Sequence, residues 1–212
     1  EMDPIADREN FIVVYPSGVG STWNADLCCG TASSSNIDDV GFTAAMLDKL
    51  EQDYCVDAKR VYATGLSNGG FISHKIACEL SDRIAAIAPV AGTLLSACEP
   101  SEPVAVMHFH GTADSIVSYN GYVGFAGVDD TIDTWVDRNS CSSSPTQVYA
   151  QGDVVCDEWS GCAGGVAVQR CKVNGGGHQW PGGFTIPGLG YNTDDIVASE
   201  AMWEFFEAHP KN

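Results

Sequence analysis

The sequence predicts an α/β fold in which a mostly parallel sheet is covered by helices on both faces. Short runs of β-branched and aromatic residues, such as Phe11 to Tyr15, are typical of buried strands. Longer segments with apolar residues at helical spacing separate these runs, and this alternation favours a parallel sheet. The chain of 212 residues, 44% of them hydrophobic, also suits a single globular domain spanning residues 1–212.

The expected elements follow in order along the chain. The strands end at turn residues and lie at 11–15, 60–64, 83–90, 104–109 and 166–173. The helices carry apolar residues three and four positions apart and lie at 37–54, 71–80, 128–138 and 194–208. Residues 19–36 are rich in Gly, Ser, Thr and Asn, which predicts a loop. Functional groups of such a sheet are expected in the loops just past the carboxyl ends of its strands.

The charge of the chain argues against two classes of partner. With 28 acidic and 10 basic residues the formal net charge is -18. A surface this negative repels nucleic acid and anionic membranes, because both are bound through Lys and Arg. No apolar run reaches the ~18 residues of a transmembrane helix. We therefore expect neither nucleic acid nor membrane as a partner; solubility alone would also account for the charge.

Nine cysteines favour a secreted or periplasmic protein. Cytosolic proteins rarely keep so many cysteines unless they bind a metal, and the chain contains no Cys-x-x-Cys pair. Disulfides in an oxidising compartment are the better interpretation. Because nine is odd, at least one cysteine is expected to be unpaired within the chain.

Ser67 is the candidate nucleophile. It lies in segment 65–69, Gly-Leu-Ser-Asn-Gly, between an expected strand and an expected helix, which is the setting of a nucleophile elbow. We expect both flanking glycines to be required, because the turn leaves no room for side chains. The helix that follows would favour negative charge developing beside the serine. A glycine-flanked serine could also form only a tight turn, so the motif depends on its context.

Asp114 and His178 complete a candidate triad. Asp114 follows the strand 104–109, and His178 lies in a glycine-rich loop after the strand 166–173. The order Ser67, Asp114, His178 is that of α/β-hydrolases, and all three lie past strand ends. Taken alone, Asp114 could cap a turn and His178 could be a surface residue. One triad explains the order of these three residues more simply than three separate and unrelated roles do.

Other candidates near the expected site have alternative interpretations. His108 and His110 would face the same side of one strand, but the chain offers no third ligand at a suitable spacing, so we expect no metal. Trp23 and Trp180 lie in loops that flank the site and could bind substrate by stacking. Either tryptophan could instead be a partly buried packing residue.

Several segments together resemble the polyhydroxybutyrate depolymerase and feruloyl esterase family of secreted esterases. The matching segments keep their order over nearly the whole chain: 23–24, 28–30, 38–42, 60–70, 88–92, 110–114 and 175–182. The resemblance implies an α/β-hydrolase fold, no cofactor, and cleavage of carboxylic esters by Ser67, Asp114 and His178. It also implies that the backbone N–H of Asn68 donates to the oxyanion.

The chain departs from this family at its amino terminus. The resemblance implies further strands before the one at 11–15, one of which ends in a His-Gly loop that provides a second oxyanion donor. No such segment precedes residue 11. We therefore expect the amino-terminal strands to be missing because the chain is incomplete; the alternative is a shortened protein.

These observations predict a serine esterase that acts on small or oligomeric esters, without predicting its oligomeric state. Hydroxyalkanoate oligomers, feruloyl or acetyl esters and small soluble esters all remain open as substrates. The alternative is a degenerate, non-catalytic binding domain of the same fold. Cysteine spacing does not fix disulfide pairing. As a hypothesis we pair Cys78 with Cys98, Cys141 with Cys162, and Cys156 with Cys171, leaving three cysteines of which two could pair.

Overall fold

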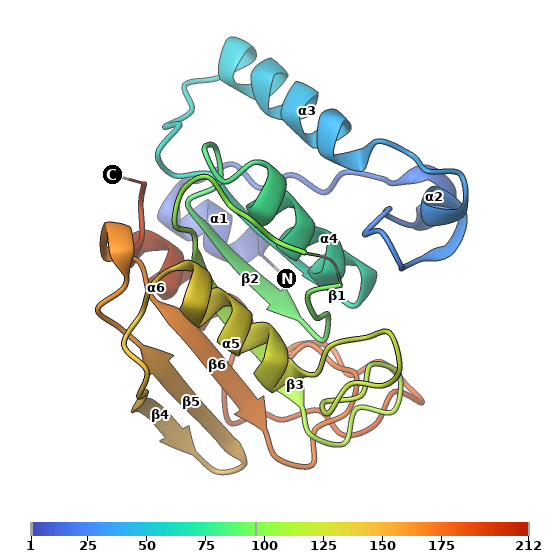
Figure 1. Ribbon diagram of the computed structural model, residues 1–212, viewed down its shortest axis with the longest axis vertical. Helices are drawn as coiled ribbons and strands as arrows, with labels where there is room; N and C mark the ends of the chain where they lie inside the picture. Colours follow the sequence, from blue (N-terminus) through green and yellow to red (C-terminus); the bar gives the residue numbers. More distant parts are fainter. Residues whose placement is uncertain (1, 96, 212) are drawn as a thin grey trace.

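The fold is a six-stranded sheet in the order β1-β2-β3-β6-β5-β4 (Figure 1). The computed structural model describes residues 2–95 and 97–211. Strands β1, β2, β3 and β6 are parallel, and β5 and β4 continue the sheet as antiparallel strands. The strands are β1 (Tyr62–Leu66), β2 (Ala86–Val90), β3 (Ala105–Gly111), β4 (Thr146–Gln151), β5 (Val154–Trp159) and β6 (Val168–Val173).

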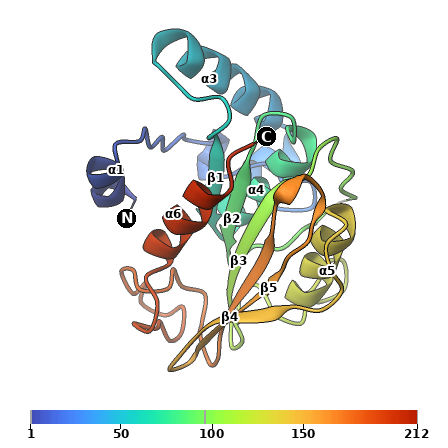
Figure 2. The same ribbon diagram turned by 90° about the vertical axis from the view of Figure 1, so that its left-hand side faces the viewer.

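Helices cover both faces of the sheet, so the predicted α/β-hydrolase architecture is confirmed (Figure 2). The α-helices are α1 (Asp3–Glu9), α2 (Gly30–Ser34), α3 (Asp39–Asp53), α4 (Asn68–Glu79), α5 (Val128–Arg138) and α6 (Ala198–Ala208), and two 3-10 turns are η1 (Val19–Ser21) and η2 (Ala163–Gly165). One apolar core joins the sheet to α4 and α5, and a second joins it to α6.

Strand β3 illustrates how the sequence creates these two cores. Successive side chains of a strand point to opposite faces. Met107 and Phe109 accordingly pack in the core under α6, whereas Val106 packs in the core under α4 and α5. His108 and His110 lie on that second face, as their spacing of two residues requires. The prediction that these two histidines face the same way is confirmed.

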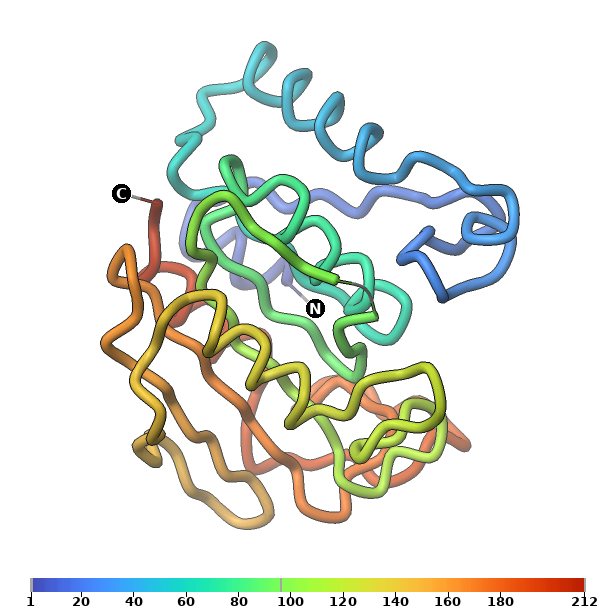
Figure 3. Tube along the Cα trace, viewed as in Figure 1, coloured from blue at the N-terminus to red at the C-terminus, as the bar shows by residue number. Residues whose placement is uncertain are grey.

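The amino-terminal part runs from α1 to the loops around α2 and returns along α3 (Figure 3). Helix α3 begins where Asp38 accepts a hydrogen bond from the Gly41 N–H at 2.8 Å. This cap satisfies one of the free N–H groups of the first turn. Helix α3 packs beside α4, and α1 packs beside α6.

The predicted strand at 11–15 is wrong. The segment is no strand in the structure, and Ile12, Val14 and Tyr15 are exposed. β-Branched residues favour a strand only where a neighbouring strand pairs with them. Within the described residues β1 pairs with β2 alone, and side chains hold this segment instead: the Phe11 ring stacks on Trp203 of α6 at 4.4 Å.

The hairpin β4–β5 was not predicted, because its alternation of apolar and polar residues is weak. Most residues of β4 are exposed and only Tyr149 of β4 packs against a core, whereas β5 buries Val154 and Cys156 in it. Helix α6 begins at Ala198, four residues later than predicted, because residues 194–197 form the turn before it. The predictions of a single domain and of missing amino-terminal strands stay predictions.

Four disulfides stabilise the fold. The three hypothesised pairs, Cys78–Cys98, Cys141–Cys162 and Cys156–Cys171, are all present, and Cys28 pairs with Cys29. Cys55 is exposed and unpaired. Across residues 2–95 and 97–211, no helix is both long enough and apolar enough to span a membrane.

Candidate active site

Ser67 occupies a strained turn between β1 and α4. Its backbone adopts φ 57° and ψ -116°, and a positive φ is uncommon for any residue other than glycine. Such a conformation costs about 1–3 kcal/mol and persists only where the surroundings enforce it. Here the Ser67 N–H donates to the Val90 carbonyl at 2.9 Å, and the Ser67 carbonyl accepts from Phe71 N–H at 3.0 Å. The turn is therefore anchored to β2 on one side and to α4 on the other.

Only one of the two glycines that flank Ser67 is sterically required. A Cβ on Gly65 would lie 2.6 Å from the backbone carbon of Gly69, closer than any real Cβ contact. A Cβ on Gly69 would meet nothing within 4 Å. The expectation that both glycines are required is wrong for Gly69, because a Cβ there would enter open space.

Asp114 and His178 form a buried hydrogen-bonded pair. Asp114 follows β3 and His178 follows β6, and these strands are neighbours in the sheet. The two loops approach so closely that a Cβ on Gly111 would lie 2.3 Å from the Gly176 carbonyl oxygen. His178 Nδ1 lies 2.7 Å from Asp114 Oδ2, and the two residues are only 4% and 6% exposed. The side chains of Asp114 and His178 therefore lie together, as predicted.

Asp114 is held in its charged form by hydrogen-bond donors. Burial alone would raise its pKa, because a carboxylate is poorly solvated there. The hydrogen bond from His178 and the backbone N–H groups of Val117 and Ile116, at 2.9 and 2.8 Å, outweigh burial and lower the pKa. The carboxylate thus stays anionic at neutral pH.

This pair determines the tautomer of His178. A carboxylate can only accept hydrogen bonds, so Nδ1 of His178 carries the proton that lies toward Asp114. In the neutral ring Nε2 then has a free lone pair, which is the form a general base requires. Because β1, β3 and β6 are parallel, Ser67, Asp114 and His178 all follow carboxyl ends at one edge of the sheet.

Asn68 connects the nucleophile turn to the loop of Trp23. Its Oδ1 accepts from the Trp23 N–H at 2.6 Å, and its Nδ2 donates to the Trp23 carbonyl at 3.0 Å. As the first residue of α4, Asn68 has a backbone N–H with no partner inside the helix. The Trp23 ring packs against the core and stacks on Phe42 at 6.2 Å.

Trp180 lies two residues after His178 and contacts α6. Its Nε1 donates to Ser199 Oγ at 3.0 Å, and its ring packs against the core under α6. These contacts are those of a packing residue, which was the alternative interpretation of this tryptophan. Substrate contact by Trp23 and Trp180 stays a prediction.

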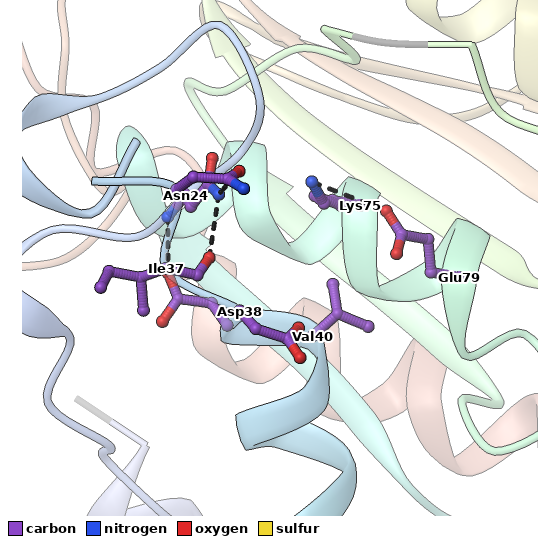
Figure 4. A pocket seen from close by; sticks show the side chains of 8 residues that line it. Asn24, Ile37, Asp38, Val40, Lys75 and Glu79 are labelled. Atoms are coloured by element: carbon purple, nitrogen blue, oxygen red, sulfur yellow. Dashed lines mark hydrogen bonds and ion pairs between the residues drawn. The ribbon is translucent and has the colours of Figure 1, made fainter. Parts of the chain in front are cut away.

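A separate cavity of about 190 Å³ is lined by Asn24, by residues 36–40 around the start of α3, and by Lys75 and Glu79 of α4 (Figure 4). Asn24 lies in the wall of this cavity. Its N–H donates to Asp39, and its Nδ2 donates to the Ile37 carbonyl at 2.9 Å. Lys75 of α4 forms ion pairs with Asp26 and Glu79. The contacts of Asn24 and the Lys75–Asp26 ion pair join the segment after Trp23 to the start of α3 and to α4, and they support the loop that carries Trp23.

Three buried histidines lie beneath the site, and sequence reasoning assigned them no role there. His74 of α4 stacks on His108 at 5.6 Å, and His108 stacks on His110 at 5.4 Å. In the described part of the chain no group of three His, Cys, Asp or Glu side chains is arranged to hold a metal. The spacing of His108 and His110 was the available signal, but their hydrogen-bond partners depend on tertiary contacts.

Known proteins similar to this chain are esterases. Feruloyl esterase B of Piromyces equi is 36% identical over 190 residues, covering 81% of this chain and 34% of that protein. Feruloyl esterase C of Emericella nidulans is 30% identical over 93% of this chain and 64% of that protein. The chain is similar in sequence to feruloyl esterases over most of its own length. No family model matches it.

The similarity covers only part of the length of each of these relatives. The chain spans about a third of the Piromyces protein and under two thirds of the Emericella protein. A bifunctional acetylxylan esterase/xylanase of Neocallimastix patriciarum is 30% identical over 84% of the chain and 25% of that protein. These relatives confirm the feruloyl esterase part of the expected resemblance, whereas the polyhydroxybutyrate depolymerase part stays a prediction.

Solved structures of two esterases share the fold of this chain. The acetyl xylan esterase from Aspergillus awamori aligns over 97% of this chain and 80% of its own, with a TM-score of 0.64 and 17% identity. A thermostable esterase aligns over 82% of this chain and 37% of its own, with a TM-score of 0.51. At such identities the likeness shows the α/β-hydrolase fold alone.

Proposed function

We propose that the chain hydrolyses carboxylic esters through a covalent acyl-enzyme on Ser67. The observation that carries this proposal is the buried Asp114–His178 pair, whose tautomer leaves His178 Nε2 free at the sheet edge where Ser67 follows β1. The sequence relationship to feruloyl esterases supports the same reaction class.

The proposed reaction proceeds in two halves. His178 Nε2 takes the proton from Ser67 Oγ while that oxygen attacks the ester carbonyl, and Asp114 stabilises the imidazolium that forms. The backbone N–H of Asn68 donates to the oxyanion, assisted by the start of α4. His178 then gives the proton to the leaving alcohol, and water releases the acid by the same route in reverse.

Feruloyl and acetyl esters of plant polysaccharide are the substrates we favour. The relatives are named as feruloyl esterases and as an acetylxylan esterase/xylanase. Hydroxyalkanoate oligomers and small soluble esters are the other candidates. Rates on methyl ferulate, nitrophenyl acetate and hydroxybutyrate oligomers separate these possibilities. We further propose that the protein is secreted, in keeping with its four disulfides.

Replacing Ser67 tests the proposal. Ser67→Ala is expected to lower kcat for nitrophenyl acetate by at least about 10³-fold, because no other group can form the acyl-enzyme. Ser73→Ala is the matched control, since Ser73 lies on the same helix and its hydroxyl only donates to the Gly69 carbonyl at 2.7 Å. Wild-type turnover in the Ser67 variant would end the assignment.

The competing proposal is a non-catalytic binding domain of the same fold. A serine-directed phosphonate distinguishes the two, because it requires an activated serine and no particular substrate. An adduct on the peptide that contains Ser67 supports the enzyme. Absence of both adduct and turnover would support the binding domain.

A further inference from the structure

His110 lies behind the candidate acid, at a contact that the proposed reaction does not use. Its Nε2 lies 2.8 Å from the Val117 carbonyl oxygen and 3.5 Å from Asp114 Oδ2. Both oxygens are acceptors, so Nε2 must carry a proton. His110 is 1% exposed, so bulk solvent does not compete for its Nε2–H.

The proton positions follow along the row of histidines. Because His110 is protonated on Nε2, its Nδ1 is an acceptor in the neutral ring, and His108 Nε2 donates to it at 3.1 Å. Trp135 Nε1 can only donate, and it lies 3.0 Å from His74 Nδ1, so His74 Nε2 donates to the Gly92 carbonyl at 3.2 Å. All three rings are neutral, and burial lowers the pKa of each of them.

Val117 is the link between His110 and the acid. Its N–H donates to Asp114 Oδ1 at 2.9 Å, and its carbonyl accepts from His110. The peptide groups on the two sides of Val117 are thus fixed by the carboxylate and by the imidazole. Asp114 N–H closes the same loop by donating to the Gly111 carbonyl at 3.2 Å.

We propose that His110 is a positioning residue, which holds loop 111–117 so that Asp114 Oδ2 faces His178 Nδ1. This inference rests on the proposed function, because it concerns the same acid and base.

The neutral state of the His110 ring has a second effect, on the charge beside Asp114. A neutral His110 leaves His178 as the histidine that takes up positive charge beside Asp114, 2.7 Å away, whereas a protonated His110 at 3.5 Å would compete for it.

The groups that face His110 come from three elements. His108 adjoins it on β3, the Tyr119 ring meets it edge-on at 5.8 Å, and Asp114 and His178 lie at the site. Burial lowers the pKa of His110 more than the Val117 carbonyl and Asp114 raise it. These surroundings keep the ring neutral over the range in which His178 would act.

His110→Met is the first test, because it removes the donor and keeps a similar volume. We expect kcat for nitrophenyl acetate to fall by about 10–100-fold with KM within about two-fold, since a misplaced acid impairs the chemical step. The acid limb of kcat/KM should also be displaced, because Asp114 Oδ2 no longer faces His178 Nδ1 at 2.7 Å. His110→Gln, which keeps an N–H in reach of Val117, should restore most of both.

His108→Met is the matched control. His108 is equally buried on the same strand, and its hydrogen bond goes to the His110 ring rather than to the backbone of loop 111–117. This variant should lose stability to a comparable degree while keeping the acid limb of the profile in place. Equal losses of kcat in the two variants, with neither acid limb displaced, would show that His110 acts only in packing.

A measurement independent of activity separates the two proposals. The proton between His178 Nδ1 and Asp114 gives a far-downfield NMR resonance, which His110→Met should shift or abolish and His110→Gln should retain. An unchanged resonance in His110→Met overturns the positioning role even if the wild type hydrolyses no ester. If His110→Met does not fold, His110→Asn, whose side chain is too short to reach Val117, is measured in the same way.

Discussion

Acidification should destabilise this protein well above the pH at which its carboxylates become protonated. His74 is 0% exposed, and burial lowers its pKa from 6.5 to about 3. Because the folded pKa lies below the unfolded one, the contribution of His74 to stability is fully present above about pH 6.5. It is lost as the pH falls toward 3, since the unfolded chain then binds a proton that the folded chain does not.

The size of the effect follows from this difference. A solution at about pH 5 is about 1.5 units below the pKa of the unfolded histidine, which corresponds to roughly 2 kcal/mol for His74 alone. Burial lowers the pKa of His108 and His110 in the same direction. The lowered pKa of Asp114 adds little to the change in stability between pH 7 and 5, because its effect is lost mainly as the pH falls below about 4. A loss of several kcal/mol is a large part of the stability of a domain.

Urea unfolding followed by circular dichroism at about pH 7, 6 and 5 measures this loss. His74→Gln should reduce the decline in the free energy of unfolding by up to about 1.4 kcal/mol per pH unit. His209→Gln, at the end of α6, removes a histidine outside the buried row and serves as the control. Equal losses of unfolding free energy in His74→Gln and the wild type between pH 7 and 5 would show that the buried His74 is not the source of this pH dependence.

Three further substitutions test the turn at Ser67 and its contact with the Trp23 loop. Gly65→Ala should cost about 3 kcal/mol or more and abolish hydrolysis, because its Cβ would overlap the Gly69 backbone, whereas Gly69→Ala should keep wild-type melting temperature and activity. Asn68→Ala should cost about 1–3 kcal/mol, because the Trp23 N–H and carbonyl lose their partners. Limited proteolysis should then cut the Trp23 loop faster, and unchanged resistance would show that the loop is held by other contacts.

The parallel half of the sheet could be predicted from sequence because its signals are local. Strands β1, β2 and β3 are mainly apolar runs bounded by turn residues, and β6 carries Gln169, Arg170 and Lys172 among its apolar residues. Each of the four strands begins within three residues of its predicted start. The segment 11–15 has the same composition but no pairing partner among the described residues, and composition cannot reveal that difference. Strand β4 is mostly exposed, so it lacks the apolar pattern on which the prediction depends.

The candidate site shows the same division between local and tertiary signals. Ser67, Asp114 and His178 could be proposed because each lies just past a strand, where the chain direction alone determines their edge. The need for Gly65 but not Gly69 depends on where the helix crosses the strand. The role we propose for His110 depends on Val117, seven residues away, whose carbonyl turns toward it only in the folded loop.

The disulfides fall into two groups, and each group cross-links one half of the molecule. Cys78–Cys98 ties the end of α4 to the loop after β2, on the side of Ser67, whereas Cys156–Cys171 ties β5 to β6, which leads to His178. Among the described residues, no disulfide joins the part before 100 to the part after 140. Across β2 and β3 the halves are held by backbone hydrogen bonds and apolar packing. If β2 and β3 separated, the nucleophile would move away from its base. Each half would still be cross-linked by its own disulfides, so the two halves could come together again.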